Sequence, residues 1–208
     1  MSEKKLLLHT CCAPCFSYVY ELLKPTYNVI SFFCNPNIAP LNEYNKRYNE
    51  LKNFCDEKRI ELYSAEHEAR RWTSLVKKHR FLGERSERCR ICYKIRLKKT
   101  FDFAKKNKIH TVATTLSISP HKDAIMINRI GKELSREFGI EFLEADFKKN
   151  DGFKKSLELS KAYGFYRQNY CGCIYSKMER NKNSLWHREQ LKRRPNKLKH
   201  IDNLKDEG

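Results

Sequence analysis

The fold of this chain is decided by the stretch Leu6-Leu7-Leu8-His9-Thr10-Cys11-Cys12-Ala13-Pro14-Cys15. Its three consecutive leucines predict a buried strand, and the cysteines follow where that strand must turn. Apolar residues then recur at helical spacing from Phe16 to Leu23, which predicts a helix starting near Phe16. The three thiols are therefore expected on a strand-to-helix turn. There, backbone N–H groups and the positive end of the helix stabilise thiolates or an anionic ligand.

Strand-like and helix-like segments alternate along the rest of the chain. Apolar and turn-forming residues predict strands at 27–34, 60–63, 110–115 and 141–145, and helices at 42–58, 66–81, 93–106, 121–138 and 153–163. This alternation predicts an α/β fold: a single doubly wound, mainly parallel sheet with helices on both faces, Rossmann-like or adenine-nucleotide-hydrolase-like. If the first strand is central and lies beside the fourth, ligands bind at that switch point, beyond the carboxyl ends of the strands. We expect the α/β domain at residues 1–176 and a basic C-terminal extension at 177–208.

The composition favours a nucleic-acid partner and reduced cysteines. Among 208 residues, 43 are Lys or Arg and 25 are Asp or Glu, so the formal net charge is +18. This excess of positive charge favours a polyanion such as nucleic acid as the partner. No stretch resembles a secretory signal or a membrane span, which predicts a cytoplasmic location and no membrane partner. Thiols stay reduced there, so nine cysteines favour metal or redox chemistry over a disulfide framework.

Two close cysteine pairs provide the ligands for a metal centre. Cys11 and Cys12 are adjacent, which suits binding to different irons of one cluster better than binding to one tetrahedral ion. Cys89 and Cys92 lie one helical turn apart and provide the second pair. Four thiolates are the usual complement of a [4Fe–4S] cluster and also satisfy structural zinc, so their number leaves the metal open. Cys15 stays open as well: as a ligand, as a ligand to a second metal, or as a thiol lining the pocket.

A third close pair, Cys171-Gly172-Cys173, suits redox chemistry. A disulfide across one intervening residue closes a small, strained ring, and strain makes the bond easier to reduce. Gly172 permits backbone angles that a side chain forbids. The alternative is a further pair of metal ligands. The two remaining cysteines, Cys34 and Cys55, lie on apolar faces and are expected in the core.

Taken together, these segments make the chain similar to the epoxyqueuosine reductases of the QueH family. The resemblance rests on an ordered series of motifs: Leu7–Cys15, Cys34–Ile38, Glu43-Tyr44 with Arg47, Glu87–Cys92, Thr114–Lys122 and Tyr166–Cys173. Residues beyond about Lys182 lie outside it. The resemblance implies a cobalamin-independent oxidoreductase that performs the last step of queuosine biosynthesis. In that step the epoxide of epoxyqueuosine, at the wobble position of a tRNA anticodon, is reduced to an alkene.

The resemblance also implies roles for individual residues. Cys171 and Cys173 match the redox-active pair of the family. An additional iron near the cluster is implied, with a carboxylate ligand for which Asp123 and Asp146 are the candidates. Four cysteines match the ligands of a [4Fe–4S] cluster: Cys11, Cys12, Cys89 and Cys92.

The implied partners are a tRNA with a queuosine-type anticodon and an external electron donor. No glycine-rich nucleotide loop occurs, so no built-in nicotinamide is expected. Four side chains are candidate proton donors or substrate contacts: His9, His121, Lys122 and Tyr170. The C-terminal extension is expected to contact tRNA, because residues 177–200 contain nine Lys or Arg and only two acidic residues. Trp186 and His187 lie among these charges and are suited to stack on unpaired bases.

Two other functions remain compatible with the residues. A zinc-stabilised tRNA-binding protein without catalysis would use the same four thiolates. A tRNA sulfur-transfer enzyme on a similar fold would use the thiols to move sulfur. A nucleotide-activating version of the second should carry a phosphate-binding loop after the first strand, where the cysteine turn stands in this chain.

Overall fold

A five-stranded sheet forms the centre of the computed structural model, which describes residues 4–182. The strands are β1 (Lys5–Thr10), β2 (Asn28–Phe33), β3 (Leu62–Ser64), β4 (Thr111–Thr114) and β5 (Glu141–Phe142). Every pairing is parallel, in the order β3-β2-β1-β4-β5. This confirms the predicted doubly wound sheet, with β1 central and beside β4. The switch point therefore lies where β1 and β4 end.

The three leucines of β1 show why this stretch is a strand. Successive side chains of a strand point to opposite faces. Accordingly, Leu7 packs into one hydrophobic core, and Leu6 and Leu8 pack into the other. All three are fully buried. A central parallel strand is covered on both faces, so it needs a continuous apolar run rather than alternation with polar residues.

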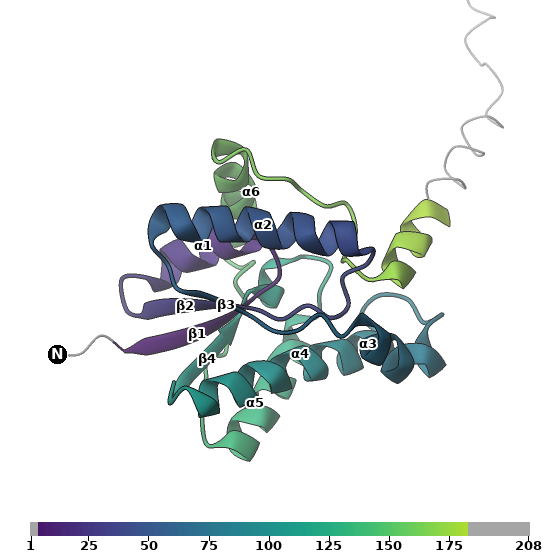
Figure 1. Cartoon of the computed structure of the whole chain (residues 1–208), viewed down its shortest axis with the longest axis horizontal. Coiled ribbons are helices and arrows are strands. Elements are labelled where there is room, and N and C mark those ends of the chain that lie inside the picture. Colours follow the sequence, from purple (N-terminus) through teal and green to yellow (C-terminus); the bar gives the residue numbers. More distant parts are fainter. Residues whose placement is uncertain (1–3, 183–208) are drawn as a thin grey trace, which may run out of the picture.

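Helices cover both faces of the sheet (Figure 1). On one face lie α1 (Ala13–Leu23), α2 (Leu41–Lys58) and α6 (Gly152–Ala162), and on the other lie α3 (Ala69–Val76), α4 (Glu87–Lys106) and α5 (Ala124–Phe138). Two short 3-10 helices are η1 (Lys77–His79) and η2 (Thr115–Ile118), and residues 174–182 are also helical. The helices thus sort to both faces, as predicted from the alternation along the chain.

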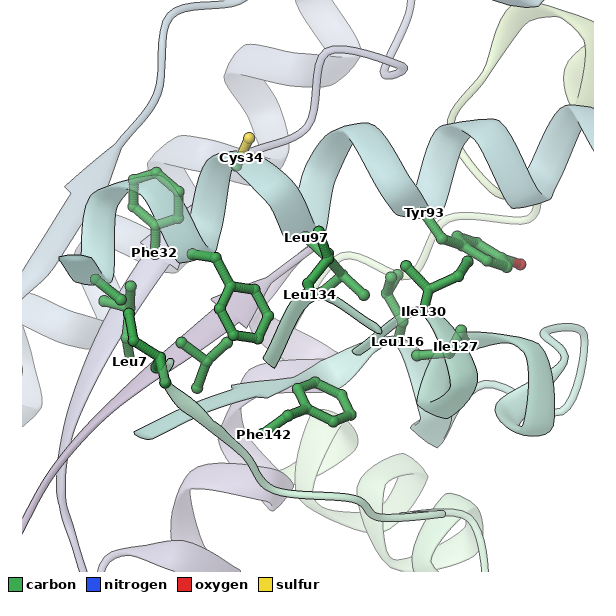
Figure 2. Close-up of a cluster of buried hydrophobic side chains, with 14 of the residues drawn as sticks. Leu7, Phe32, Cys34, Tyr93, Leu97, Leu116, Ile127, Ile130, Leu134 and Phe142 are labelled. Atoms are coloured by element: carbon green, nitrogen blue, oxygen red, sulfur yellow. The ribbon is translucent and has the colours of Figure 1, made fainter. Parts of the chain in front are cut away.

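Figure 2 shows the core between the sheet and the α4–α5 pair, where Leu7, Leu97, Leu134 and Phe142 converge. The close approach of α5 to β5 depends on Gly131. A Cβ atom at that position would lie 2.2 Å from the ring of Phe142. Glycine therefore allows this helix to pack against the edge of the sheet.

Two helices begin earlier than the sequence patterns indicated. The helix predicted from Tyr93 begins at Glu87, so Cys89 and Cys92 lie within its first two turns. Ser86 precedes it and Glu87 is in its first turn, a common helix start that the apolar pattern does not reveal. α1 begins at Ala13 rather than near Phe16, because Pro14 is compatible with a first helical turn.

The predicted boundary between domain and extension falls within the helical residues 174–182. Residues 183–208, which include most of that extension with Trp186 and His187, lie outside the described residues. The boundary therefore stays a prediction. In the part of the chain that the structure describes, no helix is both long and apolar enough to cross a membrane.

Candidate active site

A group of three cysteines, called here the cysteine trio, lies at the carboxyl end of β1. Cys11 and Cys12 follow the strand directly, and Cys15 lies in the first turn of α1. The three sulfur atoms lie within 4.8 Å of one another, and the sulfurs of Cys11 and Cys12 are 3.7 Å apart. Within residues 4–182, no other group of three His, Cys, Asp or Glu side chains is arranged so closely. The cysteine trio can therefore hold a metal ion.

Negative charge within the cysteine trio concentrates on Cys11. Hydrogen bonds from Cys12 and Cys15 hold the pKa of Cys11 well below its usual range. The hydrogen bond to Cys11 in turn raises the pKa of Cys12 to about 12, and those to Cys11 and Cys12 raise the pKa of Cys15. The hydroxyl of Thr115 donates a further bond to Cys11 Sγ at 3.6 Å. One thiolate supported by two thiols is suited to a metal cation, which displaces the remaining protons when it binds.

The second predicted ligand pair lies on α4. Cys89 packs against the same hydrophobic cluster as the cysteine trio. Cys92 packs instead with Trp72 and Cys173. Burial raises the pKa of both thiols. Cys89 and Cys92 stand outside the tight grouping of the cysteine trio, and such a separation is compatible with thiolates that bind different irons of one cluster rather than a single ion.

Two buried cations lie among these thiols. Lys122 Nζ donates to Cys171 Sγ at 3.0 Å. Burial by itself lowers the pKa of Lys122, but the negative charge of Cys171 and of other groups nearby outweighs burial and raises it well above its usual range. For Arg96, which is 1% exposed, burial is likewise outweighed by the charges of Cys92 and Cys11. Thiols from three separate segments therefore act on the same two cations, which places these segments near one another.

Gly172 determines the backbone shape of the Cys171-Gly172-Cys173 segment, called the redox segment after the role predicted for it from the sequence. Its φ of +123° lies in a region that favours glycine, and a Cβ atom there would lie 3.0 Å from Arg47 Nη1 and 3.1 Å from Ile38 Cγ1. The amide of Ala39 donates to the carbonyl of Gly172 at 2.9 Å. Both cysteines of the segment are free thiols in the structure. The segment is therefore held in an unusual conformation in its reduced state.

Arg47 of α2 contacts the same segment through its guanidinium. Its guanidinium is buried, pairs with Glu43 at 2.7 Å and donates to the carbonyl of Cys171 at 3.2 Å. Ser176 contacts both cysteines: its hydroxyl accepts from the amide of Cys171 at 3.1 Å, and its amide donates to Cys173 Sγ at 3.3 Å. Both cysteines are thus positioned by direct contacts.

A cleft of about 870 Å³ opens beside these groups. Cys15 of the cysteine trio and Cys171 of the redox segment both line it. Gln168 lines it as well, and its side-chain amide donates to Cys12 Sγ at 3.3 Å. The Oε1 atom of Gln168 is buried without a partner in the described part of the chain. Two acidic side chains, Glu84 and Glu179, line the cleft together with four basic ones: His121, Arg167, Arg180 and Lys182.

Two candidate proton donors or substrate contacts, His9 and Tyr170, already have hydrogen-bond partners within the protein. His9 is fully buried, and burial lowers its pKa to about 3. Its Nε2 lies 3.1 Å from the carbonyl of Cys34, which can only accept, and its Nδ1 lies 2.8 Å from Thr114 Oγ1. His9 is therefore a neutral structural residue. The hydroxyl of Tyr170 donates to the carbonyl of Ala39 at 2.8 Å, although the residue lines the cleft.

The two candidate carboxylates already have partners. Asp123 caps α5 by accepting from the amide of Met126 at 2.9 Å. Asp146 pairs with Lys148 at 2.8 Å. Neither belongs to the cysteine trio's grouping. Cys34 and Cys55 are fully buried, which confirms that both lie in the core.

Several residues that contact the thiols of the site received no role from the sequence, although Thr115 and Gln168 lie within motifs that carry the family resemblance. Thr115, Gln168 and Ser176 contact the functional thiols, yet each is an ordinary polar residue in a loop or at a helix start. Arg47 offered a weak signal, because Glu43 lies one helical turn before it. Such contacts become visible only when distant segments are folded together.

Comparison with known proteins identifies the family. The family model described as epoxyqueuosine reductase QueH matches residues 6–179. The chain belongs to the QueH family. It is therefore an epoxyqueuosine reductase, an oxidoreductase of queuosine biosynthesis that acts on tRNA.

Two relatives illustrate the extent of the match. The epoxyqueuosine reductase QueH of Thermotoga maritima is 40% identical over 182 residues, which cover 84% of this chain and 91% of the relative. The QueH of Streptococcus pyogenes is 34% identical over 177 residues, which cover 82% of this chain and 69% of the relative.

Among solved structures, the chain is similar to the U34-tRNA thiolase NcsA from Methanococcus maripaludis, which was solved with its [4Fe-4S] cluster. The TM-score is 0.50 at 16% identity, and the match covers 93% of this chain and 69% of the thiolase. That similarity concerns the fold alone.

Proposed function

We propose that this chain reduces epoxyqueuosine to queuosine at the wobble position of tRNA, with the modified base bound in the cleft of about 870 Å³. The observation that carries this proposal is that Cys15 of the cysteine trio and Cys171 of the redox segment line that one cleft. A bound nucleoside would then contact both a candidate metal site and a candidate reductant. Arg167, Arg180 and Lys182 of the cleft wall outnumber its two carboxylates and are suited to the phosphates on either side of the nucleoside.

The chemistry of the redox segment balances the reaction. Removing the epoxide oxygen breaks two C–O bonds, forms one C=C bond and releases water, which consumes two electrons and two protons. Cys171 and Cys173 supply both when two thiols become one disulfide. Lys122 Nζ donates to Cys171 Sγ at 3.0 Å and so holds this sulfur in place. An external electron donor then restores the dithiol. Reduced thiols of this kind fit a cytoplasmic location.

Four cysteines are the proposed ligands of a [4Fe–4S] cluster: Cys11, Cys12, Cys89 and Cys92. The donor set fits, because thiolates are the usual ligands and the buried Lys122 and Arg96 offset their negative charge. When bound, the cluster would supply electron transfer and Lewis acidity toward the epoxide oxygen. A protein of similar fold, the tRNA thiolase, carries such a cluster.

Cys15 is the sulfur of the cysteine trio that this assignment leaves over. It is therefore available to an additional iron beside the cluster. Asp123 and Asp146 remain the candidates for its carboxylate ligand, and each would have to exchange its present partner for the metal.

The test is to express the chain in iron-replete medium, purify it without oxygen, and measure iron, sulfide and turnover of tRNA containing epoxyqueuosine. We expect brown protein with stoichiometric sulfide, and Cys89→Ser should lose most of its iron. Cys55→Ser is the matched control, because Cys55 is a buried core cysteine that is not part of the cysteine trio and is not a proposed ligand. Colourless protein with stoichiometric zinc and no turnover would instead favour the zinc-stabilised tRNA-binding protein. Transfer of sulfur to tRNA would favour the thiolase-like alternative.

The basic extension is proposed as part of the tRNA-binding surface. Residues 183–208 carry Arg193, Arg194, Lys197 and Lys199. Removing one cation that neutralises a phosphate reduces the slope of log affinity against log salt by about 0.7–0.9. Changing these four residues to Ala should therefore weaken tRNA binding and reduce that slope by up to about 3. Unchanged affinity and slope would place the binding surface on the α/β domain instead.

A further inference from the structure

The loop formed by residues 77–85, called here the 77–85 loop, exposes an aromatic side chain among cations. Phe81 is 81% exposed, and its neighbour Leu82 is 45% exposed. The nine residues contain four Lys or Arg, one His and a single acidic residue, Glu84. The guanidinium of Arg80 lies 4.5 Å from the centre of the Phe81 ring. An isolated exposed apolar residue needs no explanation, but this one forms part of a cationic surface.

The 77–85 loop is anchored at three places, so the exposure of Phe81 does not come from a loosely held chain. The buried Arg88 donates to the carbonyl of Arg80 at 2.9 Å. The hydroxyl of Ser176 donates to Glu84 at 2.8 Å. Arg85 donates to the backbone carbonyls of the Pro120–His121 turn. These bonds hold the backbone on both sides of Phe81 and leave its ring in solvent.

The anchors also place the 77–85 loop at the edge of the proposed substrate cleft. Gly83 and Glu84 line that cleft together with Cys15 and Cys171. Phe81 is therefore separated by one residue along the chain from the wall that would hold the reacting nucleoside. A nucleotide adjacent to that nucleoside would be within reach of this edge.

We propose that the 77–85 loop binds an unpaired nucleotide next to the reacting nucleoside, with Phe81 stacking on its base and Lys77, Lys78 and Arg80 facing the phosphates. This inference rests on the proposed function and adds the surface that recognises the RNA. Unpaired RNA is the partner that presents both a negative backbone and flat apolar base faces. A docking protein with an apolar patch would not require the surrounding cations.

The experiment measures the Kd of an anticodon stem-loop RNA that carries 2-aminopurine next to the wobble position. Phe81→Ala should raise Kd by about 5- to 140-fold, the equivalent of removing one base–aromatic stack, and should abolish the quenching of 2-aminopurine on binding. Phe81→Trp should retain both affinity and quenching, whereas Phe81→Leu should lose the quenching. Ile125→Ala is the matched control: Ile125 is 77% exposed on α5 and lies outside the cleft, so its replacement should leave Kd unchanged.

Three results would overturn the inference. A Phe81→Ala variant that binds and quenches like the unmodified chain would remove the loop from the RNA surface. Unchanged RNA binding combined with slower turnover from a protein reductant, but not from dithionite, would assign the loop to a redox partner. If the unmodified chain fails to bind the stem-loop, the proposed function itself fails and the inference falls with it.

Discussion

The cysteine trio and the redox segment lie beside one cleft but are positioned in different ways. The sulfurs of the cysteine trio belong to one strand-to-helix turn, so their proximity follows from five consecutive positions of the backbone. Cys171 instead depends on Arg47, which is 124 residues away, and on Lys122, which is 49 residues away. The geometry of the cysteine trio should therefore tolerate distant substitutions, whereas that of the redox segment should not.

The largest expected effect separates the two groups directly. Cys173→Ser should abolish multiple turnover while retaining iron, because the disulfide can no longer form but the proposed ligands remain. Cys12→Ser should lose most of its iron and therefore all activity. Iron content and turnover measured on both variants provide the check. Loss of iron in both Cys173→Ser and Cys171→Ser would show instead that the pair binds metal. The two cysteine groups would then share one role.

The second-largest effect is expected on the stability of the protein when Arg47, which contacts the redox segment, is replaced. Arg47→Ala leaves Glu43 and the carbonyl of Cys171 without their partner in a buried site. Removing one member of a buried pair costs about 3–5 kcal/mol, which corresponds to a decrease in Tm of roughly 6–20 °C for a domain of this size.

Arg90→Ala is the matched control for Arg47→Ala. The side chains of Arg90 and Glu87 are 48% and 35% exposed, so solvent screens this pair and its loss should change Tm little. Thermal unfolding should therefore separate the two variants clearly. Equal shifts in Tm would mean that Arg47 does not support the segment in the way that its contacts indicate.

The smallest expected effect concerns the backbone of the redox segment. Gly172→Ala adds a Cβ atom at a φ of +123°, in contact with Arg47 and Ile38. Strain of this kind costs of order 1–3 kcal/mol, so Tm should decrease by roughly 2–12 °C. Gly83→Ala, where no atom lies within 4 Å of the added Cβ, should leave Tm nearly unchanged or slightly raised. A Gly172→Ala variant as stable as the Gly83→Ala variant would argue against a constrained segment.

The sequence alone predicted the elements that depend on local periodicity. The three leucines of β1 predicted a buried strand, and alternating segments predicted a parallel sheet whose switch point lies at the cysteine turn. Both predictions are confirmed, because strand and helix periods are properties of neighbouring residues. The family was also readable from an ordered series of motifs.

The tertiary structure decided which side chains lie near the cysteines. Arginine is mostly exposed in proteins, yet Arg88 and Arg96 are each only 1% exposed here. Lys122 was recognised as a candidate, but only folding brings it to Cys171. Cys15 was left undecided by its spacing and joins the cysteine trio through the early start of α1. The reason is physical: local periodicity determines which face a residue lies on, whereas its partner is set by the packing of segments far apart in the chain.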